Sequence, residues 1–434
     1  MSYWQKDIEC ISKEALKELQ LKKLRETVSR VYESVPFYGE ILKSRGIAPW
    51  DIQSLDDISL LPFTEKDDLR DNYPFGLFAV GQESIIRIHA SSGTTGKPTV
   101  SGYTAKDISC WADLMARNLS CAGLSRSSVV HVAYGYGLFT GGLGVHYGVE
   151  KLGASVIPAS GGNTARQIQL MRDFHATALC CTPSYALNLA DHMSQNGYKA
   201  DDFKLKVGIF GAEPWAEGMR RHIEESLNLK ALDIYGLTEI MGPGVAMECP
   251  EQNGLHIWED AFYPEIVDEN GNPLPDGEEG ELVITTIDKE GMPLLRYRTH
   301  DITSLISAPC ACGRTHRKIQ RIKMRTDDML VIRGVNVYPS QVEFILAQIE
   351  GIRPQFRMVV DRVDNLDTLL IEVELDSRLI GDTVKDLERL KNVATRKLSE
   401  GLLLRCDVKL VPTGSLTRGE VKAKRILDLR DKRN

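Results

Sequence analysis

The sequence contains no apolar run that approaches the roughly 18 residues of a membrane-spanning helix. It also lacks a basic cluster, because lysines and arginines are interspersed with acidic residues and the net charge is −7. A nucleic acid or an acidic membrane is therefore not an expected partner. The opening residues, MSYWQKDIEC, include acids and no apolar stretch, so we expect no secretory signal. Nine cysteines, an odd number, favour a reducing compartment, and we expect a cytoplasmic protein.

Short β-branched runs alternate with helical stretches between residues 85 and 240. This alternation is typical of α/β layers around a largely parallel sheet. Helices are predicted over Thr164–Phe174 and Trp215–Leu227. The expected strands are Ile85–Ile88, Val129–Ala133, Ala154–Ile157, Ala178–Cys181 and Val207–Phe210.

The pattern changes twice further along the chain. Residues 262–307 alternate strand and turn signals, which predicts a small antiparallel unit. Beyond residue 327, Ser340 and Glu343 have the spacing of a capping box at a helix start, and residues 369–375 alternate as in a strand. We predict an α/β fold. A large N-terminal domain of layered α/β sheets with a small antiparallel β unit spans residues 1–326, and a small α+β domain spans 327–434.

A loop of hydroxyls and glycines ending in lysine, SSGTTGKP, occupies residues 91–98. Glycines let main-chain amides approach an anion, and serine and threonine hydroxyls add donors, so the loop favours phosphate. It is not a Walker loop, which needs glycine in place of Ser91 and serine or threonine in place of Pro98. On composition alone, a polar surface turn remains the alternative.

Further segments occur in a defined order along the chain, and together with the loop they resemble the adenylate-forming superfamily of acyl-CoA synthetases. These are Tyr235–Glu239 (YGLTE), Arg296–Asp301 (RYRTHD) and Arg325–Tyr338. A closer resemblance is to the phenylacetate–CoA ligase family. It rests on Ala133–Gly142 (AYGYGLFTGG), Cys181–Tyr185 (CTPSY), Tyr235–Ala246 (YGLTEIMGPGVA), His256–Asp260 (HIWED) and Val335–Glu343 (VNVYPSQVE).

This resemblance implies the adenylate-forming fold, with a mobile C-terminal lid, and a ligase that uses ATP, Mg²⁺ and coenzyme A. A carboxylate would attack the α-phosphorus of ATP to give an acyl-adenylate and pyrophosphate. Coenzyme A thiolate would then attack the acyl carbon and release AMP. Two anions must meet in the first step, so positioned cations and hydrogen-bond donors are expected to dominate catalysis. The partners are small molecules, and a monomer and a homodimer remain equally open.

The resemblance also implies roles for residues of the nucleotide site. Thr238 would donate to the α-phosphate, and Glu239 would hold Mg²⁺. Asp301 would accept from the ribose hydroxyls, and Arg325 would act at the ribose or phosphate. The β- and γ-phosphates would lie on Ser91, Ser92, Gly93, Thr94, Thr95, Gly96 and Lys97. Adenine would lie between Tyr235, with Gly236 beside it, and Gly211, Ala212 and Glu213.

The C-terminal domain is expected to supply Lys422, which in the family bridges the carboxylate and the α-phosphate. The sequence departs from the family here, because Val421 replaces the usual glycine, and nearby Lys424 is a competing candidate. Asp327 matches the family's hinge position. A second departure, Met324 in place of glycine, weakens the ribose role of Arg325 and leaves the hinge unaffected.

Aromatic residues among glycines follow the strand predicted over Val129–Ala133 and suit a flat acyl group. The family uses this segment, with Phe210 and Gly211, as its aryl pocket, and the residues expected to line it are Tyr134, Tyr136 and Phe139. An arylacetate is the expected acid. Benzoate-like and indole-like acids stay open because one methylene discriminates weakly in an apolar pocket, by ~1–3 kcal/mol. Plain core packing is the other interpretation of these rings.

Three cysteines and a histidine provide the donor set of a structural zinc site: Cys249, His256, Cys310 and Cys312. Their spacing is not that of a zinc finger, so reduced core cysteines with a hydrogen-bonded histidine remain the alternative. All four positions would be filled by protein, which predicts a supporting metal and not a catalytic one.

Two functional alternatives remain beside the CoA ligase. One is an adenylate-forming enzyme that passes an activated aryl acid to a different acceptor. The other is a nucleotide-binding regulatory protein without turnover, against which Glu239 and Lys422 argue.

Overall fold

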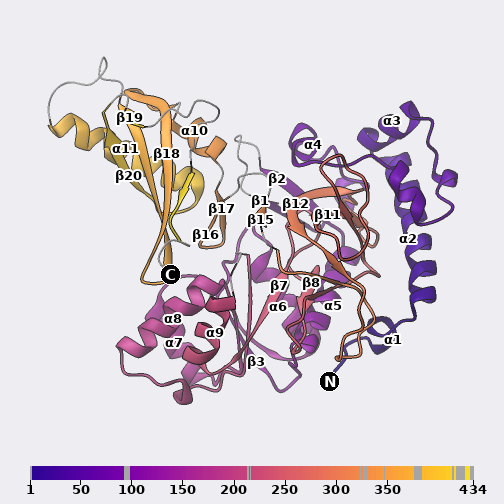
Figure 1. Cartoon of the computed structure of the whole chain (residues 1–434), viewed down its shortest axis with the longest axis horizontal. Helices are drawn as coiled ribbons and strands as arrows, with labels where there is room; N and C mark the ends of the chain where they lie inside the picture. Colours follow the sequence, from indigo (N-terminus) through magenta and orange to yellow (C-terminus); the bar gives the residue numbers. More distant parts are fainter. Residues whose placement is uncertain are drawn as a thin grey trace. The chain divides into compact units, whose positions relative to one another are not determined.

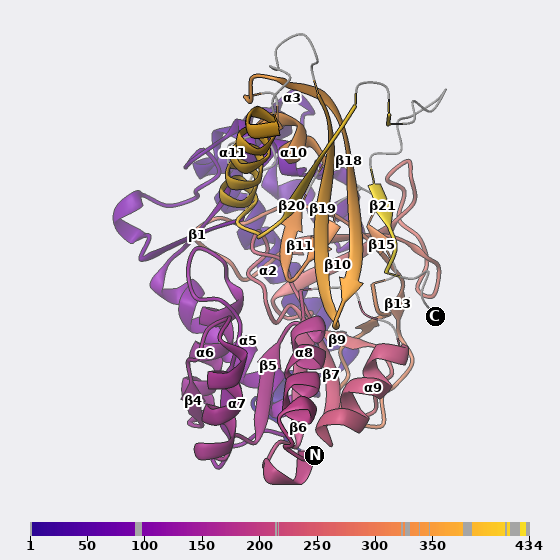
Figure 2. The same cartoon turned by 90° about the vertical axis from the view of Figure 1, so that its left-hand side faces the viewer.

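The computed structural model describes residues 2–91, 98–212, 215, 217–322, 324–325, 330–337, 339–346, 348–375, 384–412, 415–416 and 426–430. The chain forms two compact units (Figures 1 and 2). The larger comprises Met1–Ser91, Thr99–Pro183 and His192–Thr326, and the smaller comprises Ser92–Pro98, Ser184–Asp191 and Asp327–Asn434. No helix among the described residues combines the length and apolarity needed to cross a membrane.

A nine-stranded sheet forms the centre of the larger unit, in the order β13-β14-β9-β8-β7-β6-β5-β3-β4. Five neighbouring strands are parallel: β4 (Ser155–Ile157), β3 (Val129–Val132), β5 (Ala178–Cys181), β6 (Val207–Gly211) and β7 (Lys230–Tyr235). The antiparallel extension is β8 (Ala246–Glu248), β9 (Leu255–Ile257), β14 (Lys318–Ile319) and β13 (Leu305–Ile306). Four of the predicted strands are thereby confirmed within one residue at each end.

The helices that connect the parallel strands explain where ligands can bind. α6 (Gly141–Leu152) carries the chain from β3 to β4, and α7 (Thr164–Asp173) carries it back past β3 to β5. α8 (Pro183–Gln195) connects β5 to β6, and α9 (Glu217–Leu227) connects β6 to β7, so both continue in the direction that α7 began. Because parallel crossovers are right-handed, this reversal puts α6 on one face of the sheet and α7 and α9 on the other (Figure 1). The switch lies between β3 and β5, where doubly wound sheets bind ligands at the strands' carboxyl ends.

The strand that precedes the phosphate-loop candidate belongs to a different sheet from the one we predicted. β1 (Arg87–Ser91) pairs antiparallel with β2 (Thr99–Tyr103) in a two-stranded hairpin, so the prediction of a strand over Ile85–Ile88 in the parallel layer was wrong. Exposure explains the error: Ile86 and Ile88 are 60% and 45% exposed, so this apolar run does not mark a buried strand. Ser91 is the last residue of β1 and not part of the connection.

The predicted antiparallel unit is confirmed as a four-stranded sheet. Its order is β10 (Phe262–Val267), β11 (Gly280–Thr286), β12 (Tyr297–Thr303) and β15 (Met324–Arg325). Asp301 pairs with Arg325 in the β12–β15 ladder. The N-terminal helices are α1 (Lys6–Glu9), α2 (Lys13–Ser34), α3 (Pro36–Ser44) and α4 (Lys66–Asp71). The short 3₁₀ helices are η1 (Pro49–Asp51), η2 (Asp56–Leu60), η3 (Gln82–Ser84) and η4 (Ala200–Asp202).

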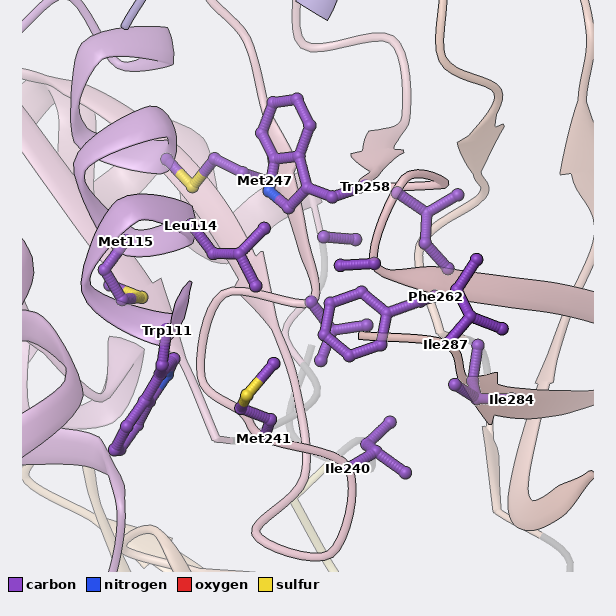
Figure 3. Close-up of a cluster of buried hydrophobic side chains, with 14 of the residues drawn as sticks. Trp111, Leu114, Met115, Ile240, Met241, Met247, Trp258, Phe262, Ile284 and Ile287 are labelled. Atoms are coloured by element: carbon purple, nitrogen blue, oxygen red, sulfur yellow. The ribbon is translucent and has the colours of Figure 1, made fainter. Parts of the chain in front are cut away.

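A continuous apolar core lies beneath the turn that follows β7 (Figure 3). α5 (Ala105–Cys121) contributes Trp111, whose indole N–H donates to Pro243 O at 3.0 Å, and Leu114. Ile240 and Met241, in the turn itself, are completely buried. Burying an aliphatic side chain stabilises a fold by about 1.5–3 kcal/mol, so this packing fixes the turn firmly.

The smaller unit has its own core, made by a sheet with two helices. The sheet order is β20 (Asp407–Val411), β19 (Leu366–Leu375), β18 (Ile352–Val363) and β21 (Ile426–Asp428); β16 (Leu330–Ile332) and β17 (Val335–Val337) form a separate hairpin. α10 (Pro339–Leu346) and α11 (Val384–Leu402) lie on the same side of the four-stranded sheet (Figure 2). Leu369, Ile371 and Val373 face the core, as their alternation predicted. The helix of this segment begins at Pro339, whose fixed φ suits a first helical position. The side chains of Ser340 and Glu343 lie outside the described residues, so their capping box stays a prediction.

Candidate active site

Glu239 lies at the centre of a polar cluster in the larger unit. It is buried in the turn after β7, and its carboxylate accepts hydrogen bonds from Thr99 Oγ1 at 3.0 Å and Ser91 Oγ at 3.3 Å. Lys66 Nζ is 3.9 Å from the same oxygen. These contacts join both strands of the β1–β2 hairpin to the turn. A carboxylate held this way is a suitable oxygen ligand for a hard cation such as Mg²⁺.

Thr238 connects the turn to the loop after β3. Its hydroxyl is 3.3 Å from that of Thr140, and its carbonyl accepts a hydrogen bond from Tyr103 OH at 3.3 Å. Thr140 directly precedes α6 and ends the aromatic segment. The structure therefore brings the predicted phosphate donor next to the predicted acyl segment.

Tyr235 and Asp301, which the sequence assigned to adenine and ribose, are in direct contact. The Tyr235 hydroxyl donates to Asp301 Oδ2 at 2.6 Å, and Asp301 is 3% exposed. His300, just before Asp301, has a left-handed φ of 62°, a conformation uncommon for side chains other than glycine. Such conformations persist where the surrounding packing dictates them, often at functional sites.

Close backbone packing explains two glycines at the ends of β6 and β7. A Cβ on Gly211 would lie 2.3 Å from Ile234 O, and one on Gly236 would lie 2.8 Å from Gly242 Cα. Ala212 follows with a left-handed φ of 67°. Phe210 is completely buried, and its ring packs edge-on against Trp215 with centroids 5.9 Å apart. Its ring thus contributes to sheet packing, and its contact with an acyl group remains a prediction.

The aromatic segment after β3 is held against β1. Leu138 O accepts from Ala90 N at 3.1 Å and lies 2.9 Å from His89 Nδ1. Tyr134, Tyr136 and Phe139 are half-buried. The Tyr136 hydroxyl lies 3.3 Å from His146 Nδ1, and burial raises its pKa above the ordinary value. These rings stay candidates for the acyl pocket.

Two lysines near Glu239 were not predicted from the sequence. Besides Lys66, Lys289 Nζ donates to Ser101 Oγ at 2.7 Å and to the main-chain O of Glu239 at 3.3 Å. Burial lowers the pKa of Lys289 to about 8, although the carboxylates of Asp107 and Glu239 oppose this shift. No motif marks either lysine, because their partners lie far away in the sequence.

Several predicted site residues lie outside the described residues: Ser92, Gly93, Thr94, Thr95, Gly96, Lys97, Glu213, Asp327 and Lys422. For Arg325 only the backbone is described. Their roles remain predictions.

The four expected metal ligands converge. The ligand atoms of Cys249, His256, Cys310 and Cys312 all lie within 4.8 Å of one another, with His256 Nε2 3.2 Å from Cys312 Sγ. His256 Nδ1 lies 3.3 Å from His316 O, an arrangement that leaves Nε2 for a metal. A hydrogen bond from Cys249 lowers the pKa of the Cys312 thiol to about 2, and one from His256 lowers that of Cys310. Thiolates are the form that binds metal.

The N-terminal segment is fastened over this cysteine cluster. Tyr3 OH donates to Cys312 O at 2.8 Å, and Arg314 pairs with Glu9 at 2.7 Å while both side chains are almost fully buried. His316 Nε2 is 3.0 Å from Ile8 O. The cluster therefore joins the β8–β9 segment, which carries Cys249 and His256, to the loop before β14 and to α1.

Comparison with known proteins agrees with this architecture. The AMP-binding enzyme family model matches residues 16–287, and the model of the AMP-binding enzyme C-terminal domain matches residues 334–430. Phenylacetate–coenzyme A ligase of Escherichia coli is 50% identical over 98% of this chain and 97% of its own length. The Thermus thermophilus enzyme of the same name is 47% identical over 98% of this chain and 99% of its own length.

A solved structure shows the same fold. 2-Hydroxyisobutyryl-CoA ligase in complex with 2-HIB-AMP and CoA has a TM-score of 0.94 and 30% identity, covering 99% of this chain and 93% of that one. The adenylate-forming fold predicted from the sequence is thereby confirmed. The chain belongs to the AMP-binding enzymes and, among them, to the phenylacetate–CoA ligase family.

Proposed function

We propose that this protein ligates phenylacetate to coenzyme A in an AMP-forming reaction. A carboxylate oxygen of phenylacetate bonds to the α-phosphorus of ATP, and the bond to pyrophosphate breaks. The thiolate sulfur of coenzyme A then bonds to the acyl carbon, and AMP leaves with the acyl oxygen. The observation that carries the proposal is the identity of about half of all residues with phenylacetate–CoA ligases over nearly the whole length.

The site geometry supports the nucleotide-dependent first step. Thr238 supplies a hydroxyl for the α-phosphate, and the buried Glu239 is the residue that would hold Mg²⁺. That ion would neutralise phosphate charge and orient the triphosphate when bound. Asp301, already accepting from Tyr235, would orient the ribose. We assign Lys422, Lys97, Arg325 and the Asp327 hinge their family roles within the same proposal.

The acyl group would bind beside Thr238, because Thr140 joins that residue to the aromatic segment. Half-buried rings such as Tyr136 suit the face of a phenyl group. An enzyme for a different aryl acid, or one with another acceptor, is the alternative. Incubation with ATP, Mg²⁺ and a panel of aryl acids, with and without coenzyme A, tests the proposal. Phenylacetyl-CoA and AMP are the expected products; AMP without thioester would favour another acceptor.

The cysteine cluster fits a structural Zn²⁺. Three sulfurs and an imidazole nitrogen give the tetrahedral donor set that zinc prefers, and the His256 Nδ1 contact with His316 O fixes the ring as in known zinc sites. We propose that Cys249, His256, Cys310 and Cys312 bind this ion, which holds α1 and the loop before β14 together. Reduced thiols also support a cytoplasmic location: none of the nine cysteines, all of them within the described residues, forms a disulfide.

A further inference from the structure

Lys289 is an unusual residue for its surroundings, because its ammonium group is buried and forms no ion pair with any residue that the structure describes. The residue is 3% exposed, and both of its hydrogen bonds go to neutral oxygens, those of the Ser101 hydroxyl and the Glu239 main chain. Nζ also lies 4.6 Å from the centre of the Tyr103 ring, whose face attracts a cation. Burying a charge in this way costs stability unless something else compensates it.

The two carboxylates closest to Lys289 are occupied by other groups. Asp107 accepts hydrogen bonds from the main-chain N–H groups of Glu290, at 2.6 Å, and Gly291, at 2.8 Å. Glu239 accepts from Ser91 and Thr99. These neutral donors leave both carboxylates charged, and their attraction holds the Lys289 ammonium beside the Glu239 site, where it can also act on a bound anion.

The backbone around Lys289 is rigid. Asp107 holds the two residues that follow Lys289, and the same carboxylate accepts from Thr104 N at 2.9 Å at the start of α5. On the other side, Asp288 pairs with Lys23 at 2.6 Å. A side chain on such a support can hold another turn in place with little loss of entropy.

We propose that Lys289 is a positioning residue of the nucleotide site: it holds the Thr238–Glu239 turn through the Glu239 carbonyl and provides a buried positive charge toward the triphosphate of a bound nucleotide. Ser101 and Tyr103 orient it from β2, the strand that also supplies Thr99 to Glu239. Lys289 acts through this turn and need not touch the substrate. This inference rests on the proposed function only in taking the ligand to be a nucleoside triphosphate.

Lys289→Met tests the proposal because methionine has similar length without charge or donor. We expect the rate of ATP–pyrophosphate exchange to fall at least about tenfold, while KM for phenylacetate stays within about twofold. The thermal midpoint should change little, since the apolar side chain removes the cost of burying a charge together with its attraction to Asp107 and Glu239. Lys22→Met, at an exposed position of α2, is the matched control, and we expect unchanged kinetics.

Binding measurements keep the test independent of turnover. Lys289→Met should weaken the binding of a fluorescent ATP analogue at least about fivefold. The affinity for adenosine should stay within about twofold of that of the unsubstituted protein, because adenosine lacks phosphates. Equal weakening of both ligands, or exchange within about twofold of the unsubstituted protein, would overturn the proposal. A thermal midpoint of Lys289→Met below that of the unsubstituted protein, together with full exchange activity once the variant is cooled and folded, would also overturn the proposal. Lys289 would then be purely structural. If the unsubstituted protein exchanges no pyrophosphate, the proposed function fails and the binding comparison still decides the role of Lys289.

Discussion

At the scale of single residues, the site depends on a carboxylate whose surroundings are mostly hydroxyls and amines. Glu239 accepts from Ser91 and Thr99, and Lys66 lies 3.9 Å away. Sequence reasoning selected Glu239, Thr238, Tyr235 and Asp301, because they belong to contiguous motifs. It could not select Lys66 or Lys289, since folding alone brings each of them near Glu239. Lys289 is 50 residues from Glu239 and 188 from Ser101 in the chain.

Glu239→Gln tests the role of that charge. The amide keeps the size and most hydrogen-bonding capacity of the side chain but binds a hard cation poorly. We expect pyrophosphate exchange to fall by about 100-fold or more, roughly 3 kcal/mol, with the thermal midpoint unchanged. Glu33→Gln, an exposed acid on α2, is the control and should have no effect. Exchange within about threefold of the unsubstituted rate would exclude Glu239 as the essential metal ligand.

At the scale of secondary structure, β7 leads directly into the nucleotide site and carries a half-buried acid. Asp233, two residues before Tyr235, lies 3.3 Å from Arg321. Burial, together with the Glu248 carboxylate, raises the pKa of Asp233 to about 7 despite this arginine. In the unfolded chain the ordinary value is 3.8. The folded state therefore binds more protons between these two values, and the stability of the fold decreases as the pH rises towards 7.

Urea unfolding at several pH values measures this effect. Between pH 5.5 and 8.5 we expect Asp233 to remove about 1–2 kcal/mol of unfolding free energy, mostly below pH 7. Asp233→Asn cannot titrate and should reduce the pH dependence by that amount, whereas Asp201→Asn, at an exposed position, should not change it. An unchanged pH profile in Asp233→Asn would contradict the raised pKa.

Element prediction succeeded where the pattern and the burial agreed. β5 matches its predicted limits, because all four of its residues are buried. It failed at β1, where an apolar run is half exposed and pairs only within a hairpin. Hydrophobic periodicity indicates which face of a strand is buried, but it does not indicate which other strand pairs with it.

At the scale of the whole molecule, the cysteine cluster joins segments more than 240 residues apart. Tyr3 contacts Cys312, and Glu9 pairs with Arg314. The sequence predicted the ligand set from its donor chemistry, but it gave no sign that α1 covers the site. This contact needs the folded chain, since nothing in residues 2–11 has a metal-binding pattern.

Removing the metal tests this support. Protein prepared without added zinc should contain about one Zn²⁺ per chain, and Cys312→Ser should contain almost none. We expect Cys312→Ser or chelation to lower the thermal midpoint by about 5 °C or more and to speed hydrogen exchange in residues 2–11. Cys406→Ser, a buried cysteine of the smaller unit, should keep the metal. Purified protein with far less than one zinc per chain would contradict the site.

In the proposed reaction, an aryl acid attacks the α-phosphorus of a nucleotide bound to the larger unit. Exchange of labelled pyrophosphate into ATP, dependent on phenylacetate and Mg²⁺ and independent of coenzyme A, measures this step directly. The account predicts rapid exchange with phenylacetate and none without an acid. Absence of exchange with phenylacetate and with every other aryl acid, in a folded protein that binds ATP, would contradict it.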